Sequence, residues 1–406
     1  MTRRRIAILG GGMLGACTAL ELARRGHAVS LVEGDSKVLN GASRWNEGKI
    51  HLGFLYAADS SLRTAKRLIP GGLAFRSLVE SLLGCDLRQF MTEDEVFLVH
   101  RDSVVDAAAF EQYARQTAAL VHEAASADAT ARYLTDVRDS AVRLLTSSEL
   151  ADVTASGDVV AGFRFPERSV STVAIADLLS ASLLNEARIE VQTGTWVTGV
   201  RRREDGRLDV LTSTAHSHID GGFDFVVNAL WEGRPAVDAT LGIQPPGPWS
   251  HRFRAAVFAY APQSALGTAV LCTGPFGDIK RYADGRVYLS WYRAGLLAEG
   301  NEIEPPRATA ALTERRRVEV LRGTLTGLAS FFPKVGGLGN DGATPEVHGG
   351  WVYAVGQGAL DDRSSTIHRR DRFNMTIDRG YISVDTAKYS LAPFLARRVA
   401  ELISSA

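Results

Sequence analysis

Three glycines close to the start of the chain have the spacing of a phosphate-binding turn. Gly10, Gly12 and Gly15 form a G-x-G-x-x-G motif directly after the apolar run 6–9, and the residues from Met13 onward have the apolar spacing of a helix. In such a turn the first glycine lets the chain bend sharply, the second leaves room for a pyrophosphate, and the third lets helix and strand pack closely. The unpaired N–H groups at the helix start would point at the phosphates. The motif therefore predicts a dinucleotide site.

An acidic residue ends the next expected strand. Residues 28–32 are apolar and β-branched enough for a second buried strand, and Glu33 follows them. Its carboxylate can accept hydrogen bonds from an adenosine ribose and would repel a 2′-phosphate, so NAD or FAD is favoured over NADP. Glycine turns between strand and helix also occur with nothing bound, but the full order of strand, turn, helix, strand and acid favours a nucleotide. The expected contacts here are Gly10, Gly12, Met13, Leu14, Gly15 and Glu33.

Composition limits the classes of partner. The 406 residues carry a formal net charge of zero, with dispersed basic residues, so nothing marks a nucleic-acid or anionic-membrane surface. Cys17, Cys85 and Cys272 are far apart, which argues against a disulfide framework and a metal site. The first strand leaves no room for a secretory signal, and no apolar run approaches the thickness of a bilayer. We expect a cytoplasmic enzyme with a small-molecule substrate.

The elements that must hold such a site alternate between helix and strand. Helices are expected at 62–69 and 73–83, separated by Pro70, and another at 309–331. Residues 251–296 alternate as in an antiparallel sheet with a hairpin turn at Asp284-Gly285. Within that hairpin we expect one face to carry Tyr288, Ser290 and Tyr292 and the other to carry Val287, Leu289 and Trp291. A last strand at 381–384 and a helix at 391–403 suggest that the chain returns to its first domain.

Four segments together resemble a known family. They are GGGMLGACTALELARRGHAVSLVE, SRWNEGKIHLGFLYAADSSLR, FDFVVNALWEGR and the C-terminal RRDRFNMTIDRGYISVDTAKYSLAPFLARRVAELI. The chain resembles the FAD-dependent amine and hydroxy-acid oxidoreductases, which include D-amino-acid oxidase, glycine oxidase, glycerol-3-phosphate dehydrogenase and L-2-hydroxyglutarate dehydrogenase. Residues 85–165 carry none of these motifs.

The resemblance implies an α/β fold in which a Rossmann-like FAD-binding domain carries an inserted α+β substrate domain with an antiparallel sheet. The FAD-binding domain would consist of residues 1–84, 166–240 and 340–406, and the substrate or cap domain of residues 85–165 and 241–339. Further FAD contacts would come from Ser43, Arg44, Asn46, Gly48, Lys49, Ile50, Val197, Ala229, Thr386, Ala387, Lys388 and Tyr389.

The same resemblance suggests residues for catalysis. His51 would stand near the flavin and take a proton from the substrate, because a histidine pKa lies near working pH; alternatively it only hydrogen-bonds to its loop. Lys388 would place positive charge beside the flavin N1 and C2 carbonyl, or else be a solvated cap. Arg363 would hold an anionic substrate group, or pair with Asp361 or Asp362 on the surface. Tyr292 would roof the site, unless it is ordinary sheet surface.

The expected activity is removal of hydride from a carbon that bears an amine or hydroxyl group of a small, anionic substrate. Two alternatives stay open from the sequence. One is a flavin-dependent hydroxylase that uses NAD(P)H, although its additional Asp-Gly phosphate signature is not clear in this chain. The other is a non-redox protein, in which FAD serves an isomerase or only the structure. A plain NAD dehydrogenase would not explain the C-terminal return to the first domain.

Overall fold

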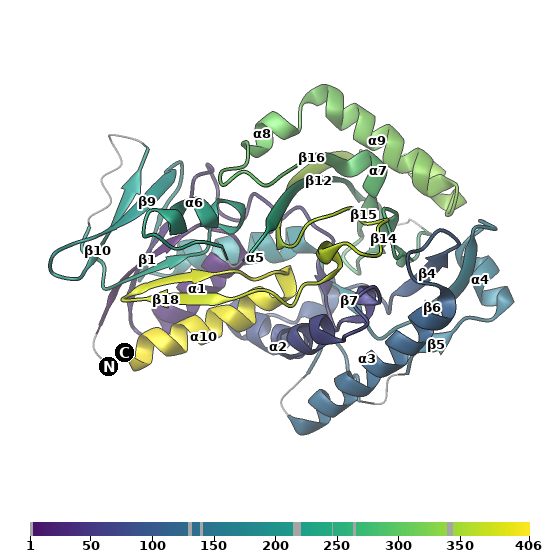
Figure 1. Ribbon diagram of the computed structural model, residues 1–406, viewed down its shortest axis with the longest axis horizontal. Coiled ribbons are helices and arrows are strands. Elements are labelled where there is room, and N and C mark those ends of the chain that lie inside the picture. Colours follow the sequence, from purple (N-terminus) through teal and green to yellow (C-terminus); the bar gives the residue numbers. More distant parts are fainter. Residues whose placement is uncertain are drawn as a thin grey trace.

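A mainly parallel sheet of six strands is built around the opening strand–helix–strand unit (Figure 1). The computed structural model describes residues 3–128, 132–138, 141–213, 221–245, 247–262, 265–338 and 344–406. Across the sheet the strands are β18 (Met375–Asp378), β19 (Tyr381–Val384), β11 (Phe225–Asn228), β1 (Arg5–Leu9), β2 (Ala28–Val32) and β8 (Ile189–Gln192). Only β18 runs antiparallel to its neighbour.

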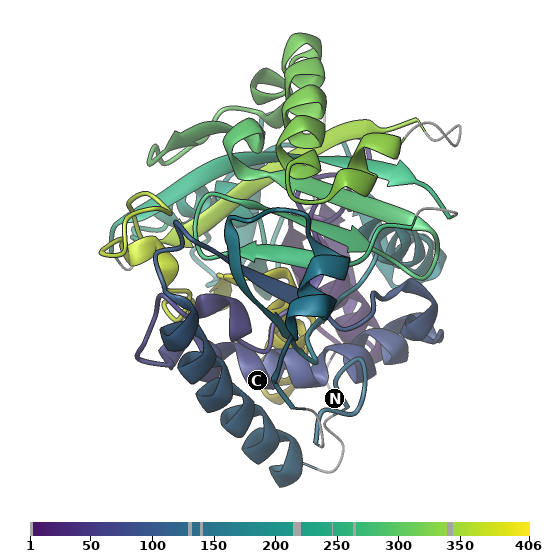
Figure 2. The same cartoon turned by 90° about the vertical axis from the view of Figure 1, so that its right-hand side faces the viewer.

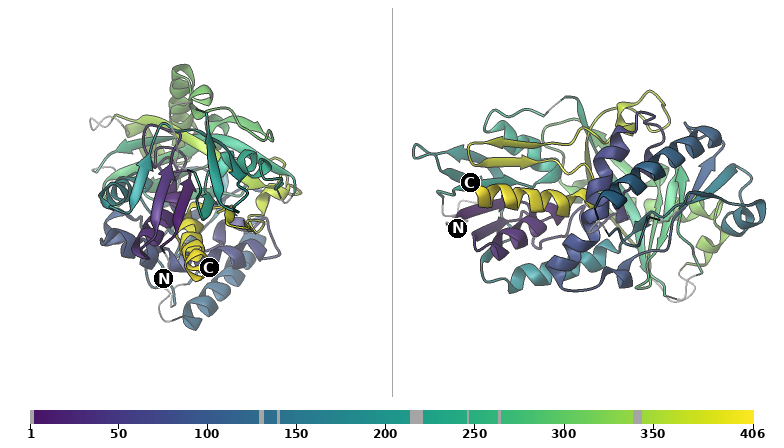
Figure 3. Two further views of the ribbon diagram at one scale, coloured as in Figure 1. Left: turned by 90° about the vertical axis from the view of Figure 1, so that its left-hand side faces the viewer. Right: turned by 90° about the horizontal axis from the view of Figure 1, so that it is seen from below.

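Helices from both ends of the chain and one from its middle cover one face of this sheet. They are α1 (Met13–Arg24), α5 (Thr172–Asn185) and α10 (Ala392–Ser405). Figure 3 shows α10 lying alongside α1, so the C-terminal segment does return to the opening unit. The chain ends also meet, because the Arg4 guanidinium donates to the Ala406 carbonyl at 2.9 Å. The order β19-β11-β1 brings segments from three distant parts of the chain to one edge of the nucleotide motif.

A second, nine-stranded sheet carries the middle of the chain. Its strands are β16 (Leu296–Gly300), β12 (Trp249–Tyr260), β15 (Arg286–Trp291), β14 (Gly277–Arg281), β13 (Ala269–Cys272), β4 (Val96–His100), β6 (Val159–Arg164) and β5 (Arg143–Leu144), with β17 (Glu346–Val355) also paired to β12. Helix α9 (Glu314–Ala329) lies across its outer face, as Figure 2 shows. The opposite face meets the loop after β2, where the Tyr282 hydroxyl donates to the Glu47 carbonyl at 2.9 Å.

The two faces of this sheet differ in chemistry, as alternation along a strand requires. Val287 and Leu289 pack with Val320 and Leu328 in the apolar core under α9. Tyr288, from the same strand, lies on the opposite face in a separate small cluster. The assignment of faces made from the sequence of this hairpin is therefore correct. Strand β15 ends at Trp291, however, and Tyr292–Gly295 form a short helix, α7.

Strand β17 pairs with β12 over ten residues, from Glu346 opposite Phe258 to Val355 opposite Trp249. It lies in the segment 340–406, which the sequence groups with the nucleotide-binding strands. The structure therefore shows that this segment supplies strands to both sheets. The division of the chain into two domains stays a prediction.

The prediction of two helices around Pro70 is wrong, because α2 runs without interruption over Arg63–Leu83. Packing explains why glycines occupy its middle. A Cβ on Gly71 would overlap the Leu391 side chain, and a Cβ on Gly72 would overlap the His51 carbonyl oxygen. Tertiary contacts override the local preference for a break. These contacts place α2 directly against His51 and Leu391, two parts of the chain that border the site described below.

The helix expected over 309–331 is also divided differently. It consists of α8 (Ala308–Ala311) and α9, because the Thr313 hydroxyl accepts the Arg316 amide and caps a new helix start. The remaining elements are α3 (Ala107–Ala127), α4 (Ser147–Val153), α6 (Arg234–Ala239), and two small sheets, β3 (Lys49–Ile50) with β7 (Arg168–Ser169) and β9 (Val197–Arg202) with β10 (Leu208–Thr212).

Candidate active site

The glycine turn has the close approaches that its motif predicts. Gly10 has φ +96°, and a Cβ there would lie 2.8 Å from the Ala229 carbonyl oxygen at the end of β11. A Cβ on Gly15 would overlap the Gly10 carbonyl oxygen. Gly12 directly precedes α1, and the Met13 amide donates to the Ser43 hydroxyl at 2.8 Å. The turn, the helix start and the following loop therefore form one backbone surface.

Glu33 stands at the edge of this surface. Its carboxylate accepts the Gly11 amide at 2.7 Å and the Asp35 amide at 2.8 Å. Burial raises the Glu33 pKa, and these amide donors oppose that shift. The Glu33 carbonyl also accepts the Thr195 amide at 2.9 Å. Val197, the first residue of β9, follows Thr195 by two positions along the chain.

The loop after β2 passes from the glycine turn toward the second sheet. Arg44 is held by Asp177 of α5 at 2.8 Å, and Asn46 donates to the Ala42 carbonyl. Gly48 packs directly on the Val170 carbonyl, and the Ile50 carbonyl accepts the Tyr133 hydroxyl at 2.6 Å. Four of the expected FAD residues in this loop, Arg44, Asn46, Gly48 and Ile50, are thus each fixed by a named contact.

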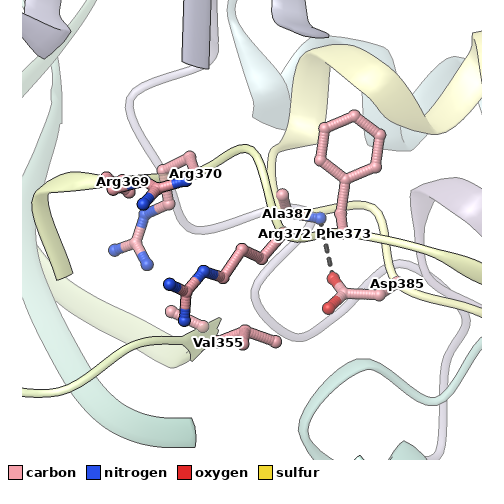
Figure 4. Close-up of a pocket in the computed structure, with 8 residues that line it drawn as sticks. Val355, Arg369, Arg370, Arg372, Phe373, Asp385 and Ala387 are labelled. Carbon is pink, nitrogen blue, oxygen red and sulfur yellow. Dashed lines mark hydrogen bonds between the residues drawn. The ribbon is translucent and has the colours of Figure 1, made fainter. Parts of the chain in front are cut away.

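The turn before α10 is fixed by a buried ionic network. Ala387 has φ +52° and its amide donates to the Asp385 carboxylate at 2.9 Å (Figure 4). Arg234 of α6 lies 3.6 Å from Asp385 and 2.8 Å from Asp238. Burial raises the Asp385 pKa, and the Arg234 charge opposes this. The network holds the segment Thr386–Tyr389 in place, so Lys388 has a defined position.

His51 and Lys388, far apart in the sequence, approach the same tyrosine. The Lys388 Nζ lies 5.6 Å from the centre of the Tyr56 ring, and the His51 ring centre lies 5.4 Å from it. Burial lowers the His51 pKa well below its usual value, and the Lys388 and Lys49 charges add to this. Burial, then Arg370, lowers the Lys388 pKa to about 8. His51 is therefore a neutral imidazole, able to accept a proton.

Three arginines that the sequence did not single out lie around this centre. The Arg252 Nη1 donates to the Tyr292 hydroxyl at 3.5 Å, and the Arg254 guanidinium lies 4.0 Å from the Tyr292 ring centre. Arg370 lines a small cavity of about 10 Å³ beside Asp385 and Ala387 (Figure 4). Burial, then the Arg252 charge, lowers the Arg370 pKa to about 10. Positive charge thus accumulates near the centre.

A sequence signal for two of these arginines exists. Arg252 and Arg254 alternate with the buried apolar Phe253, so they share the face of β12 that looks away from α9. No comparable pattern precedes Arg370. Arg363, which the resemblance suggests for substrate binding, is exposed on the loop between β17 and β18. The structure does not bring it to this centre.

The residues present fit a bound FAD. Four buried polar atoms near the centre have no hydrogen-bond partner within the described part of the chain: His51 Nδ1, Tyr56 Oη, Arg370 Nη1 and Ser390 Oγ. Buried polar atoms are normally paired, so a polar ligand is expected here. The glycine turn and Glu33 suit the diphosphate and ribose of a dinucleotide. Over the described ranges, no group of His, Cys, Asp or Glu side chains could hold a metal ion.

Comparisons with known proteins agree with this geometry. The family model described as FAD dependent oxidoreductase (DAO) matches residues 5–402. Glycine oxidase from Geobacillus kaustophilus is similar in structure, with a TM-score of 0.66, 17% identity, and coverage of 99% of this chain and 95% of that chain. L-α-glycerophosphate oxidase from Mycoplasma pneumoniae, solved with FAD bound, has a TM-score of 0.66, 16% identity, and the same coverages of 99% and 95%.

L-amino acid deaminase from Proteus myxofaciens, with a TM-score of 0.67 and 15% identity, covers 100% of this chain and 91% of that chain. A comparison with curated protein sequences returned no match. Within the described ranges, none of the helices combines the length and the apolar character needed to cross a membrane. Since the family model covers nearly the whole chain, the protein belongs to the DAO family of FAD-dependent oxidoreductases, whose members are oxidases and dehydrogenases that act on CH–NH or CH–OH donors.

Proposed function

We propose that this enzyme oxidises a small substrate whose reacting carbon bears an amine or hydroxyl group and which also carries a negative charge. The observation that supports this most directly is the group of cations formed by Arg252, which is buried, and by Arg370 and Lys388, which are half-buried. Each has its pKa lowered, first by burial and, in every case, also by a neighbouring cation. Such a group is stabilised when an anion enters, and guanidinium groups bind carboxylate or phosphate in bidentate fashion.

The proposed division of labour follows the two sheets except at β17, which lies in the segment 340–406 but pairs with β12 of the second sheet. Residues 1–84, 166–240 and 340–406 would hold FAD on a Rossmann-like core, and residues 85–165 and 241–339 would cover the substrate. The glycine turn, Glu33 and the loop 43–50 would hold the cofactor, with Val197 and Ala229 beside its adenosine end and the segment 386–389 beside the flavin. Bound FAD supplies the acceptor for hydride. His51 would take the substrate proton, Lys388 would stabilise negative charge, and Tyr292 would orient the arginines.

The names of the similar proteins are consistent with this substrate class. Glycine and glycerophosphate, named for two of them, are small molecules that bear a carboxylate or a phosphate. At 16–17% identity these proteins share the fold with this chain, so they do not name its substrate. The proposal therefore specifies the class of substrate and not the compound.

Anaerobic mixing of the FAD-loaded enzyme with amino acids, hydroxy acids and polyol phosphates tests the proposal. We expect the flavin absorbance to bleach with at least one anionic donor and not with its neutral amide or alcohol analogue. Bleaching by NAD(P)H alone would favour a hydroxylase instead. A flavin that no donor bleaches would favour an isomerase or a structural cofactor.

Replacing Arg252 with methionine is expected to raise KM for the donor that bleaches the flavin by about 100-fold, because a buried charge-assisted hydrogen bond is lost. Methionine keeps most of the side-chain volume, so the sheet should stay packed. Steady-state kinetics with that donor measure the change. Arg322→Gln, on the exposed side of α9, is the matched control and should keep the wild-type KM. An unchanged KM for Arg252→Met would contradict the role of this arginine.

The Lys388 pKa gives a pH prediction. Because burial lowers this pKa to about 8, the lysine loses its charge as the pH rises through that value. The rate of anaerobic flavin reduction should then fall above about pH 8, since positive charge near the flavin favours its reduction. Lys388→Arg should move the fall to higher pH, because a guanidinium stays charged. A pH profile that is the same in both proteins would sink this prediction.

A further inference from the structure

A cluster of charged side chains lies buried behind His51, and the function proposed above gives a role only to Lys49, through the loop 43–50 that would hold the cofactor. It consists of Lys49, Glu95, Glu167, Asp278 and Lys280, whose side chains are 1%, 0%, 0%, 14% and 0% exposed. These residues come from four separate segments: β3, the approach to β4, the turn between β6 and β7, and β14. Burying so many charges is costly unless they pair with one another.

The pairing within this cluster is close. The Lys49 Nζ contacts the Glu95 carboxylate and lies 3.8 Å from Glu167 Oε1. The Lys280 Nζ lies 3.0 Å from Glu95 Oε2 and 3.3 Å from Asp278 Oδ2. Three carboxylates thus face two ammonium groups. With every group ionised the cluster is one positive charge short of neutrality.

The cluster meets His51 through Glu167. A positive charge on the His51 ring would supply the charge that the cluster lacks. Glu167 Oε1 lies 4.0 Å from His51 Nδ1, and neither atom has a hydrogen-bond partner within the described residues. The other oxygen, Glu167 Oε2, accepts the Leu52 amide at 2.6 Å, which fixes the orientation of the carboxylate. Hydrogen bonds at catalytic groups are often long before ligands bind and shorten in the complex. A movement of about 1 Å brings this pair into hydrogen-bond range.

We propose that Glu167 is a positioning residue that acts through His51: it accepts a hydrogen bond from Nδ1–H, leaves Nε2 free to take the substrate proton, and balances the imidazolium that forms. This inference rests on the proposed function, in which His51 is the proton acceptor. As the substrate O–H or N–H bond breaks, its proton moves to Nε2 and a C=O or C=N bond forms. Bound FAD would supply the acceptor for the hydride of the adjacent C–H bond, so that the two electrons lost by the substrate would be gained by the cofactor.

The other charges that face His51 make such a partner necessary. Lys388, Lys49, Lys280 and Arg370, from four different segments, all oppose a positive imidazole. Tyr56 packs beside the ring but carries no charge, since burial raises its pKa well above the usual value. Among the described residues, Glu167 is the one carboxylate within 4.0 Å of a His51 ring nitrogen. Without it, no carboxylate of the described residues would lie within 4.0 Å of the ring nitrogens to balance the added charge.

The tautomer of His51 tests the inference without any substrate. In the FAD-loaded enzyme labelled with ¹⁵N-histidine, we expect His51 to carry its proton on Nδ1; the signal is assigned by its loss in His51→Gln. In Glu167→Met, which offers no acceptor, the proton should move to Nε2. The rate of anaerobic flavin reduction should fall by about 100-fold or more, because the base remains but loses the group that orients it and balances its charge.

Glu95→Gln is the matched control for this experiment. Glu95 is as buried as Glu167 and shares Lys49 with it, but it makes no contact with His51. If the cluster had only a structural role, both variants would change the His51 tautomer in the same way. We expect instead that His51 keeps its proton on Nδ1 in Glu95→Gln. Unfolding midpoints and FAD content are measured on both variants, and Glu167→Gln, which can still accept a hydrogen bond, should restore the tautomer but not the full rate.

An Nε2–H tautomer in the wild-type enzyme overturns the inference, and this measurement needs no variant to fold. So does an unchanged tautomer in Glu167→Met. If instead the tautomer responds as expected while no donor bleaches the flavin, the contact between Glu167 and His51 stands and the proposed function fails. The two failures are therefore distinguishable.

Discussion

Replacing Gly15 with alanine is expected to give a protein that does not retain FAD. The added Cβ would overlap the Gly10 carbonyl oxygen, a backbone atom that cannot rotate away. Relief requires α1 to move away from β1, which disrupts the phosphate-binding turn and destabilises the fold by about 3 kcal/mol or more. Flavin absorbance after purification and after incubation with FAD measures the loss.

Gly41→Ala is the control for this substitution. Gly41 lies in the loop that follows β2, it is exposed, and nothing lies within 4 Å of a Cβ built there. The variant should carry as much FAD as the wild type. A yellow, fully loaded Gly15→Ala protein would show that the turn does not hold the cofactor.

Replacing His51 with glutamine is expected to slow anaerobic flavin reduction by about 100- to 1,000-fold while FAD stays bound. The imidazole is buried and neutral, and it is the group we assign to take the substrate proton, a role that contributes about that factor. Glutamine fills a similar volume but cannot accept the proton at neutral pH. Stopped-flow reduction with the identified donor measures the rate.

His27→Gln serves as the matched control, because His27 lies beside Arg4 and Ser404 near the chain ends. The flavin of this variant should be reduced at the wild-type rate. Part of the His51→Gln loss should be recovered at high pH, where the substrate loses its proton to solvent more easily. A rate within about 3-fold of wild type at neutral pH would exclude His51 as the proton acceptor, because general-base catalysis contributes far more.

The parts of this structure that were predictable from sequence are those encoded in neighbouring residues. Gly10, Gly15 and Glu33 lie within one strand–helix–strand unit, so their spacing alone defines a surface. The face of β15 that carries Tyr288 was likewise visible as a two-residue alternation. The family resemblance added the FAD cofactor and the C-terminal return, and the match over residues 5–402 confirms the family.

The parts that were not predictable depend on pairing between distant segments. Arg252 reaches the site because β12 pairs with β17 over ten residues, a register that neither strand encodes alone. Glu95 ends an acidic run and Glu167 precedes Arg168, so both look like solvated acids in the sequence, and only the pairing of β4 with β6 brings their segments together. Arg370 and Arg363 lie in the same loop region without periodic pattern, so the sequence could not decide which of them turns inward.

The position of β11 and β19 has a consequence for biosynthesis. β1 is flanked on one side by β11, and β11 in turn pairs with β19. This edge of the sheet is therefore complete only after residues 225–228 and 381–384 have left the ribosome. Such long-range pairing makes folding slow and leaves apolar edges open during translation. We therefore expect FAD to bind only after about residue 384 has been synthesised, when this edge of the sheet can be complete.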